Sequence, residues 1–258
     1  MIHFDEYGSR NNPTVLLLHG EGVVDTFCGQ YGLKEEYHLV VPHLFGAGKE
    51  ADEEYNPAKQ LLALRELIEA IGKEKISLIG FSLGAGLAVL LTDECPQYFD
   101  RVAFFSPDIC SNRFSIGVRT VLAEIWGFFM RKKFFLRKQA ESMNFTRAQT
   151  EFYMEYGAAV KGRQYGAWVW NAISLDECIH YKKAELPMLA VCGELEGGGV
   201  KVSVAELADR NPNCRMKLIK NSGHNFLYNN RDMLNTILTE FLKADIEVVR
   251  FATEEHAV

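Results

Sequence analysis

The stretch ISLIGFSLGAGLAVLL, residues 76–91, decides the fold that we expect for this chain. The stretch begins within the run Lys75–Gly80, which is typical of a short buried strand, and it ends within residues 83–94, which are typical of a helix. Between them the letters GFSLG, residues 80–84, fit the pattern G-x-S-x-G. Small residues on both sides of a serine permit a sharp strand-to-helix turn that raises its hydroxyl group. We therefore interpret Ser82 as a candidate nucleophile.

Short apolar runs alternate with helical patterns on both sides of this stretch. The predicted strands are Thr14–Gly20, Tyr37–Pro42, Lys75–Gly80, Arg101–Ser106, Pro187–Gly193 and Cys214–Lys220. The predicted helices are Pro57–Gly72, 83–94, 200–210 and 230–244. Unbroken apolar strands between helices are typical of an α/β fold, in which helices cover both faces of a mostly parallel sheet.

The alternation is interrupted once, between Ser106 and Pro187, where about eighty residues show helical patterns and no clear strand. We expect a helical cap insertion over residues 107–186, within a core formed by residues 1–106 and 187–258. Ligands bind at the carboxyl ends of parallel strands, so an insertion at this point would roof the site.

The composition is that of an ordinary globular protein of 258 residues with a net charge of −6. An acidic chain is not built to hold nucleic acid by bulk attraction to phosphates. The start, MIHFDEYGSR, lacks the regions of a signal peptide, and no apolar run of about 18 residues could span a bilayer. The six cysteines form no CxxC pair, which favours reduced thiols. We expect a cytoplasmic protein without a transmembrane segment.

The insertion differs in charge from the rest of the chain. From Ser111 to Arg147 it carries eight Lys and Arg residues against two acids, a charge of +6 that leaves −12 for the remainder. At its centre the letters WGFFMRKKFFLRK, residues 126–138, mix bulky apolar side chains with cations. This cluster is interpreted as a solvated face, a site for an anionic substrate tail, or a contact with an acidic lipid surface.

A reactive serine needs a base, and a histidine base needs a carboxylate that orients it. His224, in the letters NSGHNF, follows the last predicted strand, from where a base could reach over the sheet edge. The loop GELEGGG after Pro187–Gly193 carries Glu194 and Glu196, and Asp108 follows the preceding strand. Each acid could equally be a solvated loop residue, so the residues alone leave the choice open.

Together the GFSLG turn, the acidic loop and His224 resemble the α/β-hydrolase superfamily, and the resemblance covers essentially the whole chain. It implies the fold described above, with a helical cap after the sixth strand. In this family the acid commonly stands three residues after the glycine that ends the seventh strand. Counted from Gly193, that position is Glu196, with Glu194 and Asp108 as less favoured acids.

The resemblance also implies an oxyanion hole formed by two backbone N–H groups, those of Leu83 and of Glu21 in the loop after the third strand. An apolar residue is common at the second position. We interpret the Glu21 side chain as solvent-facing, with tuning toward a cationic or hydroxyl-bearing substrate as the alternative. His19 is interpreted as holding loops together. His43 stands where the family often has aspartate, so the resemblance does not carry the substrate class.

Aromatic residues of the insertion are candidates for the wall of an acyl or aromatic pocket, namely Trp126, Phe129, Trp168 and Trp170. One stripe has helical spacing and is expected to pack on the sheet domain, with its edge forming part of the pocket. The stripe comprises Val118, Val121, Leu122, Ile125, Trp126 and Phe129.

The function that these features predict is that of a serine hydrolase that cleaves a carboxylic ester or related acyl compound through an acyl-enzyme on Ser82. Such chemistry needs no metal and no organic cofactor. The same residues could hydrolyse an amide, a thioester, a lactone or a carbon–carbon bond, or could persist in a ligand-binding protein with negligible turnover.

Overall fold

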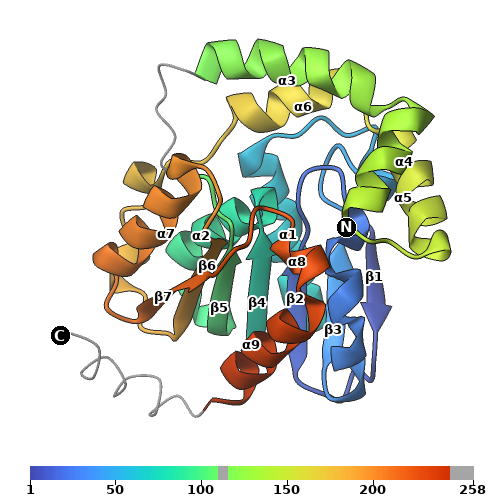
Figure 1. Cartoon of the computed structure of the whole chain (residues 1–258). Coiled ribbons are helices and arrows are strands. Elements are labelled where there is room, and N and C mark those ends of the chain that lie inside the picture. The colour runs from blue at the N-terminus through green and yellow to red at the C-terminus, as the bar shows by residue number, and fades with distance from the viewer. Residues whose placement is uncertain (110–115, 245–258) are drawn as a thin grey trace.

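The structure is a computed structural model that describes residues 1–109 and 116–244 (Figure 1). Seven strands form one sheet in the order β1-β3-β2-β4-β5-β6-β7, in which β1 runs antiparallel to β3 and the other neighbours pair in parallel. The strands are β1 (Phe4–Tyr7), β2 (Thr14–Leu18), β3 (His38–Pro42), β4 (Ile76–Phe81), β5 (Phe99–Phe105), β6 (Met188–Gly193) and β7 (Cys214–Ile219). The predicted α/β fold with a mostly parallel sheet is confirmed, and β1 is a strand that the sequence analysis did not predict.

The central strands are buried on both faces, which explains their unbroken apolar sequences. In β2, Leu16 and Leu18 belong to one apolar cluster, while Val15 and Leu17 belong to the cluster on the opposite face. Helices α1 (Pro57–Ile71), α2 (Leu83–Glu94) and α7 (Gly198–Arg210) contribute to the first cluster. The second is covered by η1 (Val24–Glu35), α8 (Phe226–Asn229) and α9 (Arg231–Lys243). Both faces are therefore sealed, as parallel sheets require.

Local signals set the helix boundaries. The side chain of Asn56 accepts a hydrogen bond from the backbone N–H of Lys59 and caps α1, and Pro57 occupies its first turn. Gly72 ends the helix in the left-handed region at φ 68°. Short 3₁₀ turns complete the connections at η2 (Gly48–Glu50), η3 (Pro96–Tyr98), η5 (Leu175–Glu177) and η6 (Tyr181–Lys183).

Four helices lie above the carboxyl ends of the strands and are called the cap helices here (Figure 1). They are α3 (Ile116–Met130), α4 (Lys133–Ser142), α5 (Arg147–Ala159) and α6 (Gly162–Trp170). They follow β5, the fifth strand of this sheet, so the strand count implied by the family resemblance is one too high for this chain. For the same reason, the loop with Glu21, implied to follow the third strand, follows β2, and the loop with Glu196, implied to follow the seventh strand, follows β6.

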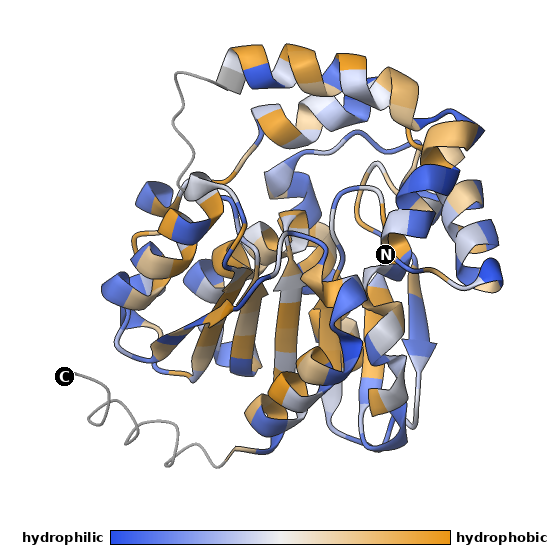
Figure 2. Cartoon of the chain, viewed as in Figure 1, coloured by the Kyte–Doolittle hydropathy of each residue, from blue (hydrophilic) through white to orange (hydrophobic). Residues whose placement is uncertain are grey.

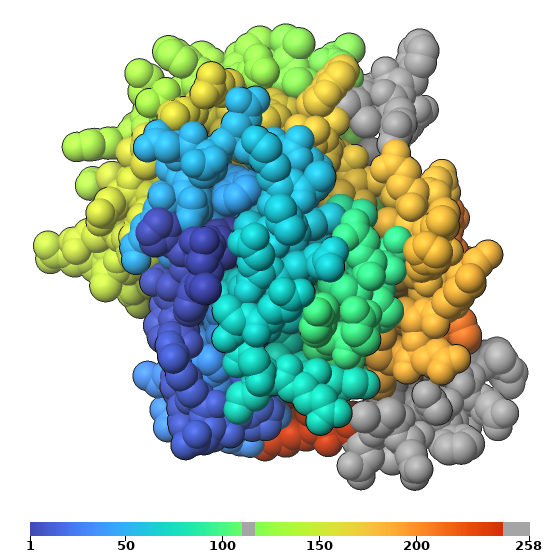
Figure 3. Space-filling view, turned by 180° about the vertical axis from the view of Figure 1, so that it is seen from behind, coloured from blue at the N-terminus to red at the C-terminus, as the bar shows by residue number. Residues whose placement is uncertain are grey.

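The stripe expected to pack on the sheet domain faces solvent instead. Val118, Leu122 and Ile125 are more than half exposed, and α3 forms an outer edge of the molecule (Figure 3). The opposite face of α3 packs along α6, where a Cβ at Gly127 would lie 2.4 Å from the ring of Tyr165. The expectation was wrong because α6 lies between α3 and the sheet (Figure 1). Periodicity identifies an apolar face but not what covers it.

The remaining expectations from composition concern thiols and membrane spans. The five described cysteines are free, and four of them are buried, whereas Cys110 lies outside the described residues. Within residues 1–109 and 116–244, no helix has the length and apolarity that crossing a membrane would require.

Candidate active site

The loop between β4 and α2 holds Ser82 in a conformation that few residues adopt. Its backbone has φ 53° and ψ −114°, and its N–H donates to the carbonyl oxygen of Phe105 at 2.8 Å. Non-glycine residues at such angles cost about 1–3 kcal/mol and cluster at functional sites. A Cβ at Gly80 would lie 2.3 Å from the carbonyl oxygen of Gly84, and one at Gly84 would lie 2.1 Å from that of Leu18. Both glycines of the motif are therefore required by close backbone packing.

Two backbone N–H groups next to Ser82 are left without acceptors. In the described part of the chain, neither Leu83, at the first turn of α2, nor Glu21, after β2, donates its backbone N–H to any group. Two donors without a protein acceptor beside one serine are suited to an incoming oxygen. Leu83 and Glu21 both lie beside Ser82, and the oxyanion hole that the family resemblance implies stays a prediction.

His19 fixes the orientation of one of these donors. Its Nε2 accepts from the backbone N–H of Leu44 at 3.0 Å, so its Nδ1 carries the proton and donates to the carbonyl oxygen of Gly20 at 2.6 Å. Burial lowers the pKa of His19 to about 4, which keeps the ring neutral. Because the peptide unit is planar and trans, holding the Gly20 carbonyl on one side turns the Glu21 N–H to the other. The interpretation of His19 as a loop-holding residue fits these bonds.

The histidine and the acid meet at the same edge of the sheet. Nδ1 of His224 donates a 2.6 Å hydrogen bond to Oε2 of Glu196. Side-chain exposure is 47% for His224 and 2% for Glu196, so the base is accessible while the acid is enclosed. The ring of His224 lies 4.9 Å from that of Phe81, the residue before Ser82. With Nδ1 engaged by Glu196, Nε2 is the nitrogen available for exchanging a proton.

The second oxygen of Glu196 is also held. Its Oε1 accepts from the Ser106 hydroxyl at 2.7 Å and from the Gly193 N–H at 2.7 Å. Burial acts to raise the pKa of Glu196, but the hydrogen bonds from His224, Gly193 and Ser106 outweigh it and lower the pKa below its usual value. Glu196 is therefore held as a carboxylate that can stabilise an imidazolium.

Sequence reasoning missed Ser106, which follows β5 and has φ 51°. A serine at the end of an apolar strand gives no signal that distinguishes it from a turn residue. Its role becomes visible only when β5 and β6 pair and bring it to Glu196.

The other two acids bond elsewhere. Glu194 is exposed, and its Oε2 accepts from the backbone N–H of Asn221 at 2.9 Å. Asp108 accepts from the Arg119 guanidinium of α3 at 2.9 Å, so it links the core to the cap. The structure therefore brings Glu196, of the three candidates, to His224.

Ser82 lies between two pockets beneath the cap. The first has a volume of about 180 Å³ and is bordered by Ser82 and His224 from the core and by Trp126 from the cap. The second has a volume of about 60 Å³ and is bordered by Ser82, Leu83, Arg119 and other residues from the core and cap. A substrate whose carbonyl lies at Ser82 thus has space on both sides of the scissile bond.

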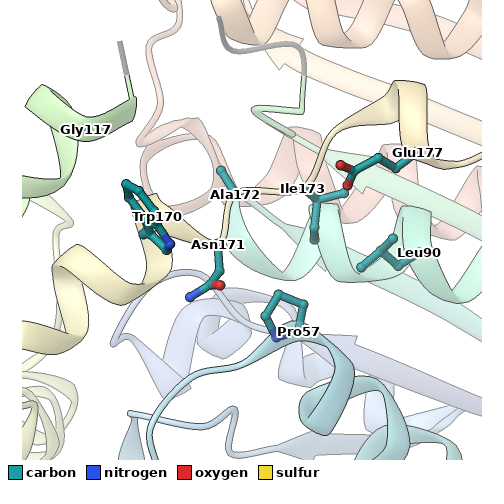
Figure 4. A pocket seen from close by; sticks show the side chains of 8 residues that line it. All are labelled: Pro57, Leu90, Gly117, Trp170, Asn171, Ala172, Ile173 and Glu177. Atoms are coloured by element: carbon teal, nitrogen blue, oxygen red, sulfur yellow. The ribbon is translucent and has the colours of Figure 1, made fainter. Parts of the chain in front are cut away.

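A third, larger pocket adjoins the second and has a volume of about 590 Å³ (Figure 4). The two share Asn171, Ala172 and Ile173, and Figure 4 shows these residues between the ends of α6 and α2. Trp170 from α6 and Pro57 from α1 border the larger pocket. It therefore extends the space beside Ser82 toward the surface of the molecule.

The four aromatic pocket candidates have different outcomes. Trp126 borders the 180 Å³ pocket, Trp168 the 60 Å³ pocket and Trp170 the 590 Å³ pocket. Phe129 borders none of these three pockets and is 45% exposed on the outer face of α3. Its assignment to a pocket wall therefore stays a prediction.

The Glu21 side chain borders both pockets next to Ser82. Solvent reaches it there, although surrounding protein desolvates it and raises its pKa. The charges of His224 and Arg119 act to lower this pKa, and that of Asp108 acts to raise it further. The side chain is solvent-accessible as expected, but it faces the site. Within the described residues, no group of three or more His, Cys, Asp or Glu side chains is placed to hold a metal ion.

Solved structures of other proteins share the fold of this chain. The enol-lactonase from Burkholderia xenovorans LB400 has a TM-score of 0.77 at 16% identity, with 94% of this chain and 96% of that one covered. A carboxylesterase structure from the thaumarchaeon Nitrososphaera gargenis gives 0.74 at 15% identity, with coverages of 96% and 94%. A thermophilic esterase from Thermogutta terrifontis gives 0.73 at 17% identity, with coverages of 96% and 94%. These likenesses show the fold.

Among curated proteins, an uncharacterized protein of Mycobacterium tuberculosis is 29% identical over 100 residues. The match covers 37% of this chain, and the chain spans only 29% of the length of that relative. The model of the alpha/beta hydrolase family matches residues 15–235, which include the serine turn, Glu196 and His224. This chain therefore belongs to the α/β hydrolase family.

Proposed function

We propose that this protein is a serine hydrolase that cleaves a carboxylic ester or related acyl compound through an acyl-enzyme on Ser82. The observation that carries the proposal is the 2.6 Å bond from His224 to the enclosed carboxylate of Glu196, with His224 and Ser82 bordering one pocket. A histidine that is oriented in this way can act as the base that a serine hydroxyl requires.

In the first half of the reaction, Ser82 Oγ attacks the substrate carbonyl carbon as Nε2 of His224 takes its proton. The carbonyl oxygen becomes an oxyanion that accepts hydrogen bonds from the N–H groups of Leu83 and Glu21, each worth about 2.7–4 kcal/mol in the transition state. Collapse of this intermediate breaks the bond to the leaving group, which departs with the proton from His224. The acyl group remains bonded to Ser82.

In the second half, His224 takes a proton from water, and the hydroxide oxygen attacks the acyl carbon. The same two N–H groups hold the second oxyanion, and the proton on His224 returns to Ser82 Oγ as the acid product leaves. Glu196 stays ionised throughout and stabilises the imidazolium. Its lowered pKa supports this role, because the carboxylate must not take the proton itself.

The type of acyl bond that the protein cleaves is proposed from its likeness to solved structures. The similar structures include an enol-lactonase, carboxylesterases and a thioesterase domain, all named for acyl substrates. Among these acyl substrates, carboxylic esters are the simplest, so we propose that the substrate is an ester. The two pockets flanking Ser82 fit a small to medium substrate with one group on each side of the carbonyl.

Turnover of short-chain p-nitrophenyl esters tests the proposal. The wild-type protein should release p-nitrophenol, and Ser82→Ala should reduce the rate by several orders of magnitude. Ser77→Ala is the matched control, because Ser77 lies on β4, the strand that leads to Ser82, and bonds Asp100, and it should retain the activity. Absence of turnover of every ester by the wild-type protein would favour a ligand-binding member instead.

A further inference from the structure

The cap helices expose an apolar surface that nothing in the described chain covers. Eight of the sixteen exposed large hydrophobic side chains lie between residues 118 and 134, and the other eight are scattered over the rest of the described residues. We call these eight the cap patch: Val118, Val121, Leu122, Ile125, Trp126, Phe128, Phe129 and Phe134. Single exposed apolar residues are normal, but a contiguous group marks a surface that meets another apolar phase.

The cap patch is a helix face rather than an open loop. Its members on α3 recur at spacings of three and four residues and are at least 45% exposed, whereas Gly127 of the same helix packs on Tyr165 of α6. Figure 2 shows orange positions along α3, which lies outermost, with no described element beyond it. An exposed apolar helix face such as the cap patch can insert into the interface of a lipid bilayer.

Four cations that form no ion pair within the described residues adjoin the patch. Arg131, Lys132, Lys133 and Arg137 are exposed, and in the described part of the chain none of them forms an ion pair with a carboxylate. The ammonium of Lys132 lies 5.0 Å from the ring centre of Phe128, so charge and aromatic surface are interleaved. The rest of the chain is acidic, with −12 outside residues 111–147, so the cap is the end that an anionic surface would attract.

We propose that the cap patch and these four cations form a docking surface for membranes that contain anionic phospholipid. Aromatic and aliphatic side chains would enter the headgroup boundary, while the cations contact lipid phosphates, as in interfacial amphipathic helices. Trp126 belongs to the patch and also borders the pocket at Ser82, so docking would bring the pocket to the membrane. This last consequence alone rests on the proposed hydrolase function.

Vesicle flotation tests the proposal without reference to activity. The wild-type protein should float with vesicles of phosphatidylcholine mixed with phosphatidylglycerol at low salt, and less at high salt or with phosphatidylcholine alone. Leu122→Asp should lower the partition coefficient about tenfold or more. Leu62→Asp is the matched control, because Leu62 on α1 has the same 59% exposure as Leu122, and it should bind as the wild type does.

The charges are tested by the double variant Lys132→Gln/Lys133→Gln against Lys182→Gln/Lys183→Gln, an exposed lysine pair on η6, outside the cap helices. Only the first pair should lose binding to the anionic vesicles. All variants should retain turnover of a soluble ester, so loss of docking and loss of hydrolysis are read separately.

Three results would overturn the proposal. The first is a wild-type protein that stays unbound with anionic vesicles at low salt. The second is an equal loss of binding in Leu122→Asp and Leu62→Asp. The third is a lipid-free dimer that Leu122→Asp converts to a monomer, since a second copy of the chain would then cover the patch.

Discussion

Glu196 holds His224 with one carboxylate oxygen, at 2.6 Å from Nδ1, while its other oxygen is fixed by Ser106 and Gly193. The acid thus has no rotational freedom left, and the histidine tautomer is set by a rigid partner. This relationship separates Glu196 from Glu194, which lies two residues away and bonds Asn221 instead.

Replacing Glu196 with glutamine should lower kcat by about three to four orders of magnitude, because the amide can present an N–H to Nδ1 and favour the wrong tautomer. The rate of p-nitrophenyl acetate hydrolysis measures this. Glu194→Gln, the matched control on the same loop, should stay near the wild-type rate. Equal losses in the two variants would show that the loop, rather than the carboxylate, matters.

Replacing His19 with alanine should lower kcat by about a hundredfold and leave KM little changed, because the Gly20 carbonyl is released and the Glu21 N–H loses its fixed direction. The control is His38→Ala, another buried histidine, which bonds Thr14 and Glu6 away from the site. Steady-state kinetics of both variants give the comparison. A matching fall in kcat for His38→Ala would mean that general destabilisation, not the oxyanion hole, explains the loss.

Replacing Gly84 with alanine should destabilise the protein by more than about 2 kcal/mol, because the new Cβ would lie 2.1 Å from the backbone oxygen of Leu18. Gly117→Ala on α3 meets nothing within 4 Å and should instead stabilise the helix by about 0.5–1 kcal/mol. Urea unfolding of both variants measures the two free energies. A Gly84→Ala protein as stable as the wild type would contradict the close approach of α2 to β2.

Acid should remove the contribution of Glu196 to stability. Its pKa is lowered in the folded state from an ordinary value of 4.5, so its contribution is complete above that value and is lost as the pH falls through the folded-state pKa. The difference in free energy of unfolding between wild type and Glu196→Gln should therefore shrink below about pH 4.5. Urea unfolding across a pH series checks this, and a difference that stays constant down to acid pH would refute the lowered pKa.

The sequence alone predicted the secondary-structure elements that are determined by neighbouring residues. The apolar strands, the capped helix from Pro57 and the glycine turn around Ser82 all follow from signals within a few residues, and each is present in the structure. The strand β1 was missed because FDEY is polar and short, and it forms only by pairing with β3 at the sheet edge.

Non-local relationships were not predictable in the same way. The choice of Glu196 from three acids depended on family resemblance and becomes a geometric fact only when β6 and β7 are paired. The stripe on α3 was assigned to the interior because a helical period states how wide an apolar face is, not which neighbour covers it. Ser106 and the direction of the Glu21 N–H likewise depend on contacts between distant segments.

The central claim is that Ser82 is the nucleophile, and mass spectrometry after treatment with a fluorophosphonate tests it most directly. The account predicts one covalent adduct per chain, located on the peptide that contains Ser82, absent in Ser82→Ala and retained in Ser77→Ala. An adduct of the same mass that persists in Ser82→Ala, or that maps to another residue of the wild-type protein, would contradict it.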